Sequence, residues 1–162
     1  MPHRRNSHKN LGQILLDRKK ISESQLSLAL QMRKYSKKQA LLGEILLDLR
    51  FVSEDDILEA AIEQYQFSYL PVNQYEIDPQ VLGLVPREIA EKYTLIPLER
   101  VKSALTVVMA NPTDEKAIKE VELVSECQLS IFIDKASEIR QAINMYYGSD
   151  NPEFFTDLSL PS

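Results

Sequence analysis

One internal repeat constrains the fold of this chain more than any other feature. The segment "NLGQILLDRKKISESQ" at residues 10–25 returns as "LLGEILLDLRFVSEDD" at residues 41–56. The offset is 31 residues, both between Gly12 and Gly43 and between Ser22 and Ser53. A fixed offset of this kind predicts one structural unit that is built twice and packed against its own copy.

Each repeat predicts a short amphipathic helix, a polar break and a longer helix. Ser22 with Gln25 matches a capping box, in which each side chain bonds the other residue's backbone N–H. Ser53 with Asp56 is a shorter-armed version of the same motif. The longer helices keep apolar stripes at a spacing of three or four residues. These stripes hold Leu26, Ala29, Leu30 and Arg33 in the first repeat, and Ile57, Ala60, Ala61 and Gln64 in the second. We therefore expect two helix pairs, packed into a four-helix lobe around a pseudo-twofold axis.

The remainder of the chain predicts a different lobe. The stretch "FSYLPVNQYEIDP" is rich in aromatic and β-branched residues and holds two prolines, so we expect an extended connector. Pro86 suits the start of a helix over "REIAEKY". Two strands follow in "LIPLERVKSALTVVMANP", turning around Val101–Ser103.

The last third of the chain predicts a helix, a strand and a final helix. Thr113 is the expected cap of "DEKAIKEVELVSE", "QLSIFI" reads as a strand, and Gly148 stops a helix over "SEIRQAINMYY". The carboxylates of Glu115, Glu120, Glu122 and Glu126 are expected to form a solvated face.

The predicted fold class is α+β, with a lobe of tandem helix pairs followed by a small lobe holding a three-stranded sheet and flanking helices. We place the boundaries at residues 1–9 for a basic start, 10–68 for the helical lobe, 69–148 for the α+β lobe and 149–162 for a tail.

Composition narrows the functional classes. The chain has 162 residues, 44% of them hydrophobic, with a net charge of −5 and a pI near 5.1. This balance disfavours nucleic acid as a partner, since phosphate contacts need clustered basic residues. No apolar run approaches the roughly 20 residues of a membrane helix, so we expect a cytoplasmic protein without direct membrane insertion. Cys127 is the single cysteine and is expected to be a small buried side chain.

Motifs for catalysis and metal binding do not occur in the sequence. None of the four glycines begins a GxxxxGK[ST] phosphate loop. His3 and His8 lack cysteine or carboxylate partners at ligand spacing, and no serine or cysteine can be tied to a histidine base. We expect neither an enzyme nor a metal or cofactor site. Gly12 and Gly43 allow close approach to the backbone, by a neighbouring helix or by a ligand.

Several phrases of the sequence together resemble one family. They are the tandem "LGxILLD…SE" motifs, "YLPVNQYEIDPQVLGLVPREIAEKYTLIPLER", "LTVVMANPTDEKAI" and "IRQAINMYYG". In this order they are similar to the N-terminal MshEN domain of the ATPases that drive type II secretion and type IV pilus assembly. The resemblance covers residues 10–148. It implies a non-catalytic regulatory domain that docks onto membrane-platform or motor proteins, and thereby reaches the inner membrane peripherally.

The resemblance also implies an alternative function, as a receptor for the second messenger cyclic di-GMP. In one branch of the family each motif begins Arg-Leu-Gly, has a second glycine seven residues after the first, and ends in glutamine. The matching places here are Leu11, Gly12, Leu15 and Leu26 in the first motif, and Leu42, Gly43, Leu46, Ile57 and Gln64 in the second. The departures are Asn10 and Leu41 at the arginine places, Lys19 and Arg50 at the second-glycine places, and Arg33 at the first glutamine place. Arg5, Lys37 and Lys38 are the nearby cations that could substitute.

Partner docking is expected to use aromatic anchors near the junction of the two lobes. The candidates are Phe67, Tyr69 and Tyr75. The alternative is that these side chains only join the lobes. Two readings of the whole chain also stay open, a stand-alone adaptor and the front piece of a longer ATPase.

Overall fold

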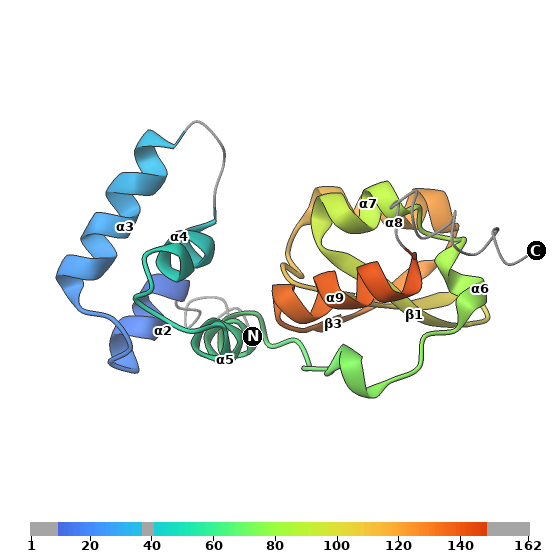
Figure 1. Cartoon of the computed structure of the whole chain (residues 1–162), viewed down its shortest axis with the longest axis horizontal. Helices are drawn as coiled ribbons and strands as arrows, with labels where there is room; N and C mark the ends of the chain where they lie inside the picture. The colour runs from blue at the N-terminus through green and yellow to red at the C-terminus, as the bar shows by residue number, and fades with distance from the viewer. Residues whose placement is uncertain (1–9, 37–40, 149–162) are drawn as a thin grey trace, which may run out of the picture. The chain divides into compact units, whose positions relative to one another are not determined.

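The structure is a computed structural model that describes residues 10–36 and 41–148 (Figure 1). The chain forms two compact units, which divide between Phe67 and Ser68. Each unit is described by itself.

Over residues 10–36 and 41–67, the first unit contains four helices, and they confirm the predicted helix pairs. They are α2 (Leu11–Asp17), α3 (Glu23–Tyr35), α4 (Leu42–Asp48) and α5 (Glu54–Tyr65). The first helix of each pair contacts the second helix of the other pair, so α2 packs on α5 and α4 packs on α3. The buried core is Ile14, Leu15, Ile21, Ala29, Leu42, Ile45, Leu46 and Ala60. The two repeats therefore share one core.

Both longer helices begin at the predicted capping boxes. The Gln25 N–H donates to Ser22 Oγ at 3.1 Å, and the Ser22 N–H donates to Gln25 Oε1 at 2.9 Å. The shorter-armed version also closes, with the Asp56 N–H 3.1 Å from Ser53 Oγ and the Ser53 N–H 3.0 Å from Asp56 Oδ2. Each box satisfies N–H groups that the first helical turn leaves without partners.

The second unit is built around a mixed sheet of β1 (Leu95–Val101), β2 (Ala104–Met109) and β3 (Gln128–Ile133). The strand order is β1-β2-β3, with β1 antiparallel and β3 parallel to β2. Val101 pairs with Ala104 across the predicted turn, where Lys102 has a φ of 57°. The parallel pair is connected through α8 (Glu115–Ser125), in the predicted order of strand, strand, helix, strand and helix.

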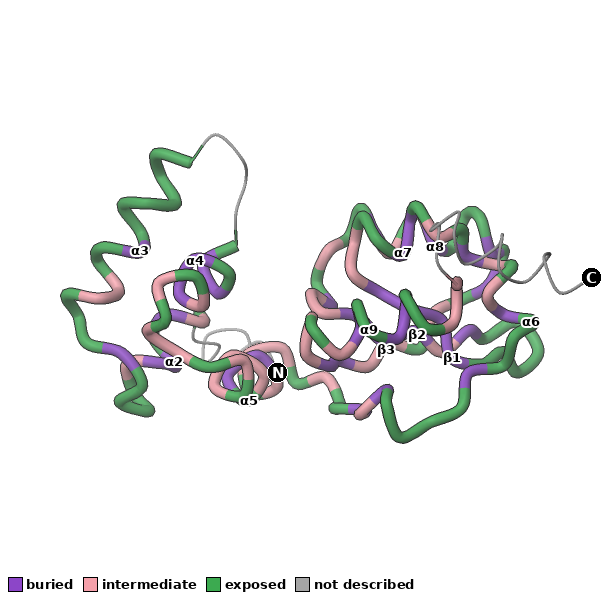
Figure 2. Tube along the Cα trace, in the orientation of Figure 1, coloured by how far each residue is buried: buried purple, intermediate pink, exposed green. Residues whose placement is uncertain are grey.

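The other elements of this unit are short, except for the final helix. They are η1 (Val72–Gln74), α6 (Pro79–Leu82), α7 (Arg87–Tyr93) and α9 (Ala136–Tyr146). Helix α7 begins directly after Pro86, as predicted. Helix α9 packs on β1 and β2, and buried positions concentrate in the sheet and on the inner sides of the helices (Figure 2). Cys127 is buried, as expected.

Three details of the second unit correct the sequence predictions. The cap of α8 is Asp114, whose carboxylate accepts from the Ala117 N–H at 3.1 Å, while the Thr113 hydroxyl bonds the side chain of Asn111. The segment predicted as an extended connector contains the 3₁₀ turn η1, and α6 begins at its final proline. Glu120 is half-buried and accepts a hydrogen bond from the Tyr93 hydroxyl at 2.5 Å, so it does not belong to a fully solvated face.

Candidate functional site

The tandem glycines lie where the two repeats meet. A Cβ placed on Gly12 would stand 2.9 Å from Leu26 Cδ1 and 3.5 Å from Leu42 Cδ2. A Cβ on Gly43 would stand 3.3 Å from Leu11 Cδ2 and 3.5 Å from Ile57 Cδ1. These neighbours are equivalent under the 31-residue offset, so each glycine touches the long helix of its own repeat and the first leucine of the other. Both glycines thus permit close packing of the lobe.

The other predicted site residues divide by burial. Leu15 and Leu46 have no exposed surface, and Leu42 is 9% exposed, so these three side chains belong to the core. Leu11, Leu26, Ile57 and Gln64 are half-buried and retain surface that a ligand could contact. The structure therefore brings the two motifs together at the paired glycines.

At the arginine places the structure shows different roles for the two residues. Asn10 caps α2, since its Oδ1 accepts from the Gln13 N–H at 2.8 Å. Leu41 precedes α4 and is 47% exposed, with no side-chain cap bond. Neither side chain supplies the cationic donors of the family motif.

The backbone conformation at the two second-glycine places is one that favours glycine. Lys19 has a φ of 61° and Arg50 a φ of 63°, the left-handed region that favours glycine. The Lys19 and Lys20 N–H groups bond the carbonyls of Leu16 and Leu15, each at 2.9 Å. This pairing is a Schellman motif, which ends a helix on one left-handed residue.

The end of α4 repeats the arrangement. The Arg50 N–H bonds the carbonyl of Leu47 at 2.9 Å, and the Phe51 N–H bonds that of Leu46 at 3.0 Å. Both short helices thus end in the same motif, with a cationic side chain at the left-handed position.

A charged cluster joins α2 to α5. Arg18 Nη2 lies 2.8 Å from Glu63 Oε1, and Arg18 Nη1 lies 3.6 Å from Glu59 Oε1. Lys20 Nζ lies 3.2 Å from Asp56 Oδ1. The backbone N–H of Ser53, together with Lys20, holds the pKa of Asp56 below its ordinary value. The sequence analysis did not predict this cluster, because Arg18 and Glu63 are 45 residues apart and belong to different repeats.

Gln64 carries one polar atom without a partner. Its Oε1 is buried and accepts no hydrogen bond within the part of the chain that the structure describes. Gln64 occupies the final place of the second motif, so an acceptor is available at a motif position.

Tyr69 and Tyr75 lie on a segment that is held against the sheet. The Ile133 N–H donates to the Ser68 carbonyl at 2.9 Å, and the Leu70 N–H donates to the Ile133 carbonyl at 3.1 Å. The tyrosines are 45% and 49% exposed, whereas Phe67, the last residue of the first unit, is half-buried.

A buried carboxylate fixes the same segment between the two tyrosines. Asp134 is 2% exposed, and its Oδ2 accepts from the Val72 N–H at 2.9 Å while its Oδ1 accepts from the Lys135 N–H at 2.7 Å. Burial raises the pKa of the Asp134 carboxyl above its ordinary value, against the lowering effect of the two backbone donors. No sequence pattern indicated this residue.

Some predictions fall outside the described residues or concern features not found within them. Arg5, Lys37, Lys38, His3 and His8 lie outside the described ranges, as do the predicted start at 1–9 and tail at 149–162. Within residues 10–36 and 41–148, no cluster of histidine, cysteine and carboxylate side chains could hold a metal ion. Over the same ranges, no helix is both long and apolar enough to cross a bilayer.

Comparison with known proteins identifies the family. The family model of the MshEN domain matches residues 65–153. The type IV pilus assembly ATPase PilB of Myxococcus xanthus is 25% identical over 142 residues, which are 88% of this chain and 25% of that ATPase. The PilB of Thermus thermophilus is 29% identical over 116 residues, or 70% of this chain and 13% of that protein. The chain thus spans a quarter or less of these relatives.

Solved structures share the fold. A structure of MshE with cyclic di-GMP superposes with a TM-score of 0.73 at 23% identity, covering 86% of this chain and 100% of that one. The N-terminal domain of XpsE gives a TM-score of 0.70 at 23% identity, covering 85% of this chain and 94% of that one. Because the family model matches more than half of the sequence, the chain belongs to the MshEN domain family.

Proposed function

We propose that the chain is a non-catalytic regulatory domain of a type II secretion or type IV pilus ATPase, which docks onto membrane-platform or motor proteins. Its family and its similarity to the N-terminal regions of pilus assembly ATPases support this role. The domain acts in the cytoplasm and reaches the inner membrane peripherally, through its partner.

The observation that carries the proposal is the fixed presentation of Tyr69 and Tyr75. Aromatic side chains are enriched among the anchors of protein interfaces. Here the backbone between the two tyrosines is held by Ile133 and Asp134, so little conformational entropy is lost when a partner covers the rings. Phe67 is the third candidate anchor.

A binding experiment tests the docking surface. The chain is immobilised and used to capture the platform protein of the same machine, with Tyr69→Ala and Tyr75→Ala as variants. Leu123→Ala on α8 is the matched control, since Leu123 is 77% exposed and has no role in the proposal. We expect both tyrosine variants to lose capture while Leu123→Ala retains it. Equal capture by all three folded variants would remove the tyrosines from the docking site.

A second candidate function, reception of cyclic di-GMP, is favoured by the paired glycines. The close packing at Gly12 and Gly43 keeps the two motifs together, and MshE, of the same fold, has been solved with that ligand. Leu11, Leu26, Ile57 and the open acceptor of Gln64 are the side chains that would contact it. The missing arginines oppose tight binding. Each lost donor to a charged group costs about 1.5 to 3 kcal/mol.

Calorimetry tests the second candidate. We expect the parent to bind cyclic di-GMP no more tightly than about 10 μM, or about −6.8 kcal/mol. The variant with Asn10→Arg, Leu41→Arg, Lys19→Gly and Arg50→Gly restores the family motif and should bind more tightly. Submicromolar binding by the parent would place the receptor role ahead of the docking role. A folded revertant that does not bind would reduce the repeat to a packing motif.

A further inference from the structure

The sheet of the second unit has two edges, and the outer edge of β1 is protected against further pairing. This strand holds Pro97, a register shift between Pro97 and Glu99, and the charged residues Glu99 and Arg100. The Leu98 carbonyl at this edge accepts a hydrogen bond from the Asp78 N–H at 3.2 Å. Prolines, bulges, charges and covering segments are the features that keep an edge strand from pairing with another chain. The edge of β1 is therefore closed.

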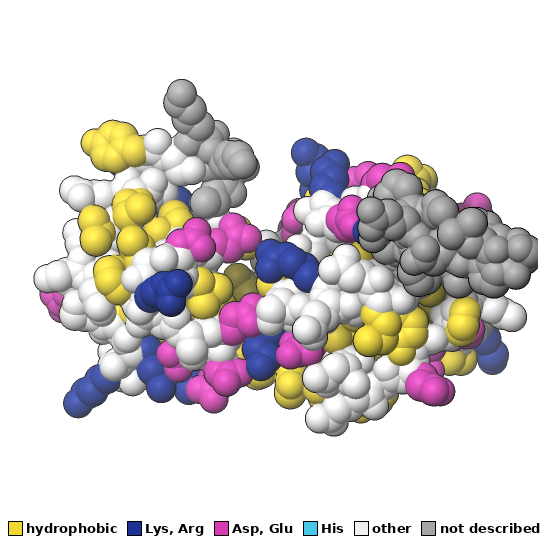
Figure 3. Space-filling model, viewed as in Figure 1, with side chains coloured by type: hydrophobic (Ala, Val, Ile, Leu, Met, Phe, Trp, Pro, Cys, Tyr) yellow, Lys and Arg dark blue, Asp and Glu magenta, His cyan; other side chains and the backbone are white. Residues whose placement is uncertain are grey.

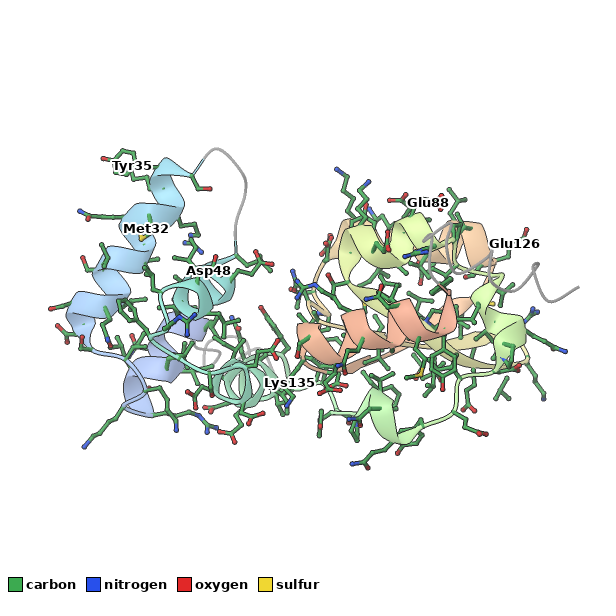
Figure 4. The ribbon with its side chains drawn as sticks, in the orientation of Figure 1. Met32, Tyr35, Asp48, Glu88, Glu126 and Lys135 are labelled. Carbon is green, nitrogen blue, oxygen red and sulfur yellow. The ribbon has the colours of Figure 1, made fainter. Side chains whose placement is uncertain are left out.

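The outer edge of β3 lacks the first three of these features. Its sequence "QLSIFI" contains no charged residue and no proline, and it pairs with β2 without a register shift. Figure 3 shows charged side chains of both signs over the visible face of the second unit, and β3 contributes none of them. Glu126 before the strand and Lys135 after it lie at opposite ends of this unit (Figure 4). The edge between them is uncharged.

Two residues of β3 have backbone groups that point away from the sheet. The Gln128 N–H bonds the Ser103 carbonyl at 2.7 Å, so the even-numbered residues of β3 face β2 and the odd-numbered ones face outward. Leu129 and Ile131 are therefore outward-facing. Within the residues that the structure describes, their N–H and carbonyl groups have no hydrogen-bond partner. The edge thus presents two donors and two acceptors.

The far end of the same edge already accepts an extended segment. Ile133 is the next outward-facing residue, and its N–H and carbonyl bond Ser68 and Leu70. Tyr69, between them, pairs with Ile133 in parallel orientation as an isolated bridge. The open part of the edge begins at Ile131, two residues or about 7 Å away. It is therefore continuous with the segment that holds the proposed anchor Tyr69.

We propose that a segment of the docking partner adds to this edge as a fourth strand, hydrogen-bonded to Leu129 and Ile131. The inference rests on the docking function proposed above and specifies the chemistry of the segment that is bound. An extended backbone presents acceptors and donors at the spacing of these two residues. The partner segment should be uncharged, with apolar side chains at alternate positions. Leu129 and Ile131 are half-buried against the core of the second unit, and a charge placed beside them would lose water without gaining a partner.

Hydrogen exchange at single amides tests the pairing. In the free chain, the amides of Leu129 and Ile131 should exchange faster than those of Ser130 and Phe132, which face β2. When the platform protein of the same machine is bound, exchange at Leu129 and Ile131 should slow at least about 10-fold. Binding of the platform protein without this slowing would overturn the added strand and leave the tyrosine anchors in place. If the platform protein does not bind at all, both the docking function and the added strand are wrong.

A proline at position 131 tests the edge by mutation. Ile131→Pro removes an outward-facing N–H, and proline is tolerated on an edge strand at such a position. Ile131→Ala is the matched control, because it shortens the same side chain and keeps the N–H. Capture of the platform protein by Ile131→Pro should be at least about 10-fold weaker than by Ile131→Ala, with circular dichroism confirming both folds. Equal capture by the two folded variants would overturn the proposal.

A second pair of variants leaves the strand backbone intact and applies if Ile131→Pro does not fold. Ser130 is exposed, and Ser130→Lys places on this edge the kind of charge that opposes strand pairing. Ser130→Gln is its uncharged control. The lysine variant should capture the platform protein at least about 10-fold more weakly than the glutamine variant. Equal capture by this pair would likewise reject the fourth strand.

Discussion

Replacing Lys19 and Arg50 by glycine should stabilise the first unit. Both residues occupy the left-handed position of a Schellman motif, at φ values of 61° and 63°. An L-residue in this conformation costs about 1 to 2 kcal/mol. Glycine avoids that strain but loses about 0.5 to 1 kcal/mol through its greater freedom in the unfolded chain. The difference favours each glycine variant by about 0.5 to 1 kcal/mol.

The assay is urea unfolding, with hydrogen exchange read on the peptides that hold α2 and α4. Both substitutions remove exposed side chains, so no core contact changes. The effects should add to about 1 to 2 kcal/mol in the double variant, because the two residues end separate helices. Exchange should slow at the ends of both helices.

The control is Gln31→Gly in the exposed middle of α3, where the backbone is helical. There glycine should destabilise by about 0.5 kcal/mol, somewhat less than the roughly 1 kcal/mol that separates glycine from alanine. The same type of substitution should therefore change the free energy of unfolding in opposite directions at the left-handed positions and in the helix. If Lys19→Gly and Arg50→Gly destabilise the unit as much as Gln31→Gly does, the argument from backbone strain is refuted.

Three further predictions address packing, burial and catalysis. Gly12→Val and Gly43→Val should each destabilise the first unit by about 1 to 3 kcal/mol through overpacking, as measured by urea unfolding; parental stability in both would contradict the close-packing role. Asp134→Ala leaves the buried Val72 N–H without its acceptor and should destabilise the second unit by about 1 to 3 kcal/mol. Because burial raises the pKa of Asp134 in the folded state, the folded chain binds this proton more tightly, so the parent's advantage over the variant should grow as the pH falls through that pKa. The purified chain should release no phosphate from ATP, since its sequence has no phosphate loop; turnover that persists through further purification would contradict this expectation.

Local sequence signals predicted most of the helices and strands. Caps, short turns and buried polar residues that depend on tertiary contacts were not predicted. The repeat and the capping boxes at Ser22 and Ser53 were sufficient to predict helices α2 to α5. Thr113 and Asp114 are both common caps, and the choice between them depends on which side chain reaches the Ala117 N–H. Helix α6 is a single turn, too short to show a period. The burial of Asp134 arises from contacts 62 residues apart, which no local pattern records.

The candidate site was also predictable only in part, because its repeated motif is visible in the sequence and the burial of its side chains is not. The offset of 31 residues placed Gly12 and Gly43 at equivalent positions, and the structure brings their neighbours together. Sequence alone could not separate the side chains that keep exposed surface, such as Leu26, from those with none, such as Leu15. The burial of each side chain depends on how the helices pack, and the motif has leucine both at the buried position and at the partly exposed one.

The pairing of α2 with α5 also determines when the first unit can form during synthesis. Helix α2 has 7 residues, well below the roughly 12 to 15 at which an isolated helix becomes marginal in water. Its partner Glu63 follows Arg18 by 45 residues, which a ribosome adds in about 2 to 9 s at typical rates. Helices α3 and α4 are made in between and can pack on each other first. The residues of α2 that face α5 therefore remain accessible to chaperones until α5 has emerged, whereas Leu26 and Leu42, the neighbours of Gly12, are synthesised before it.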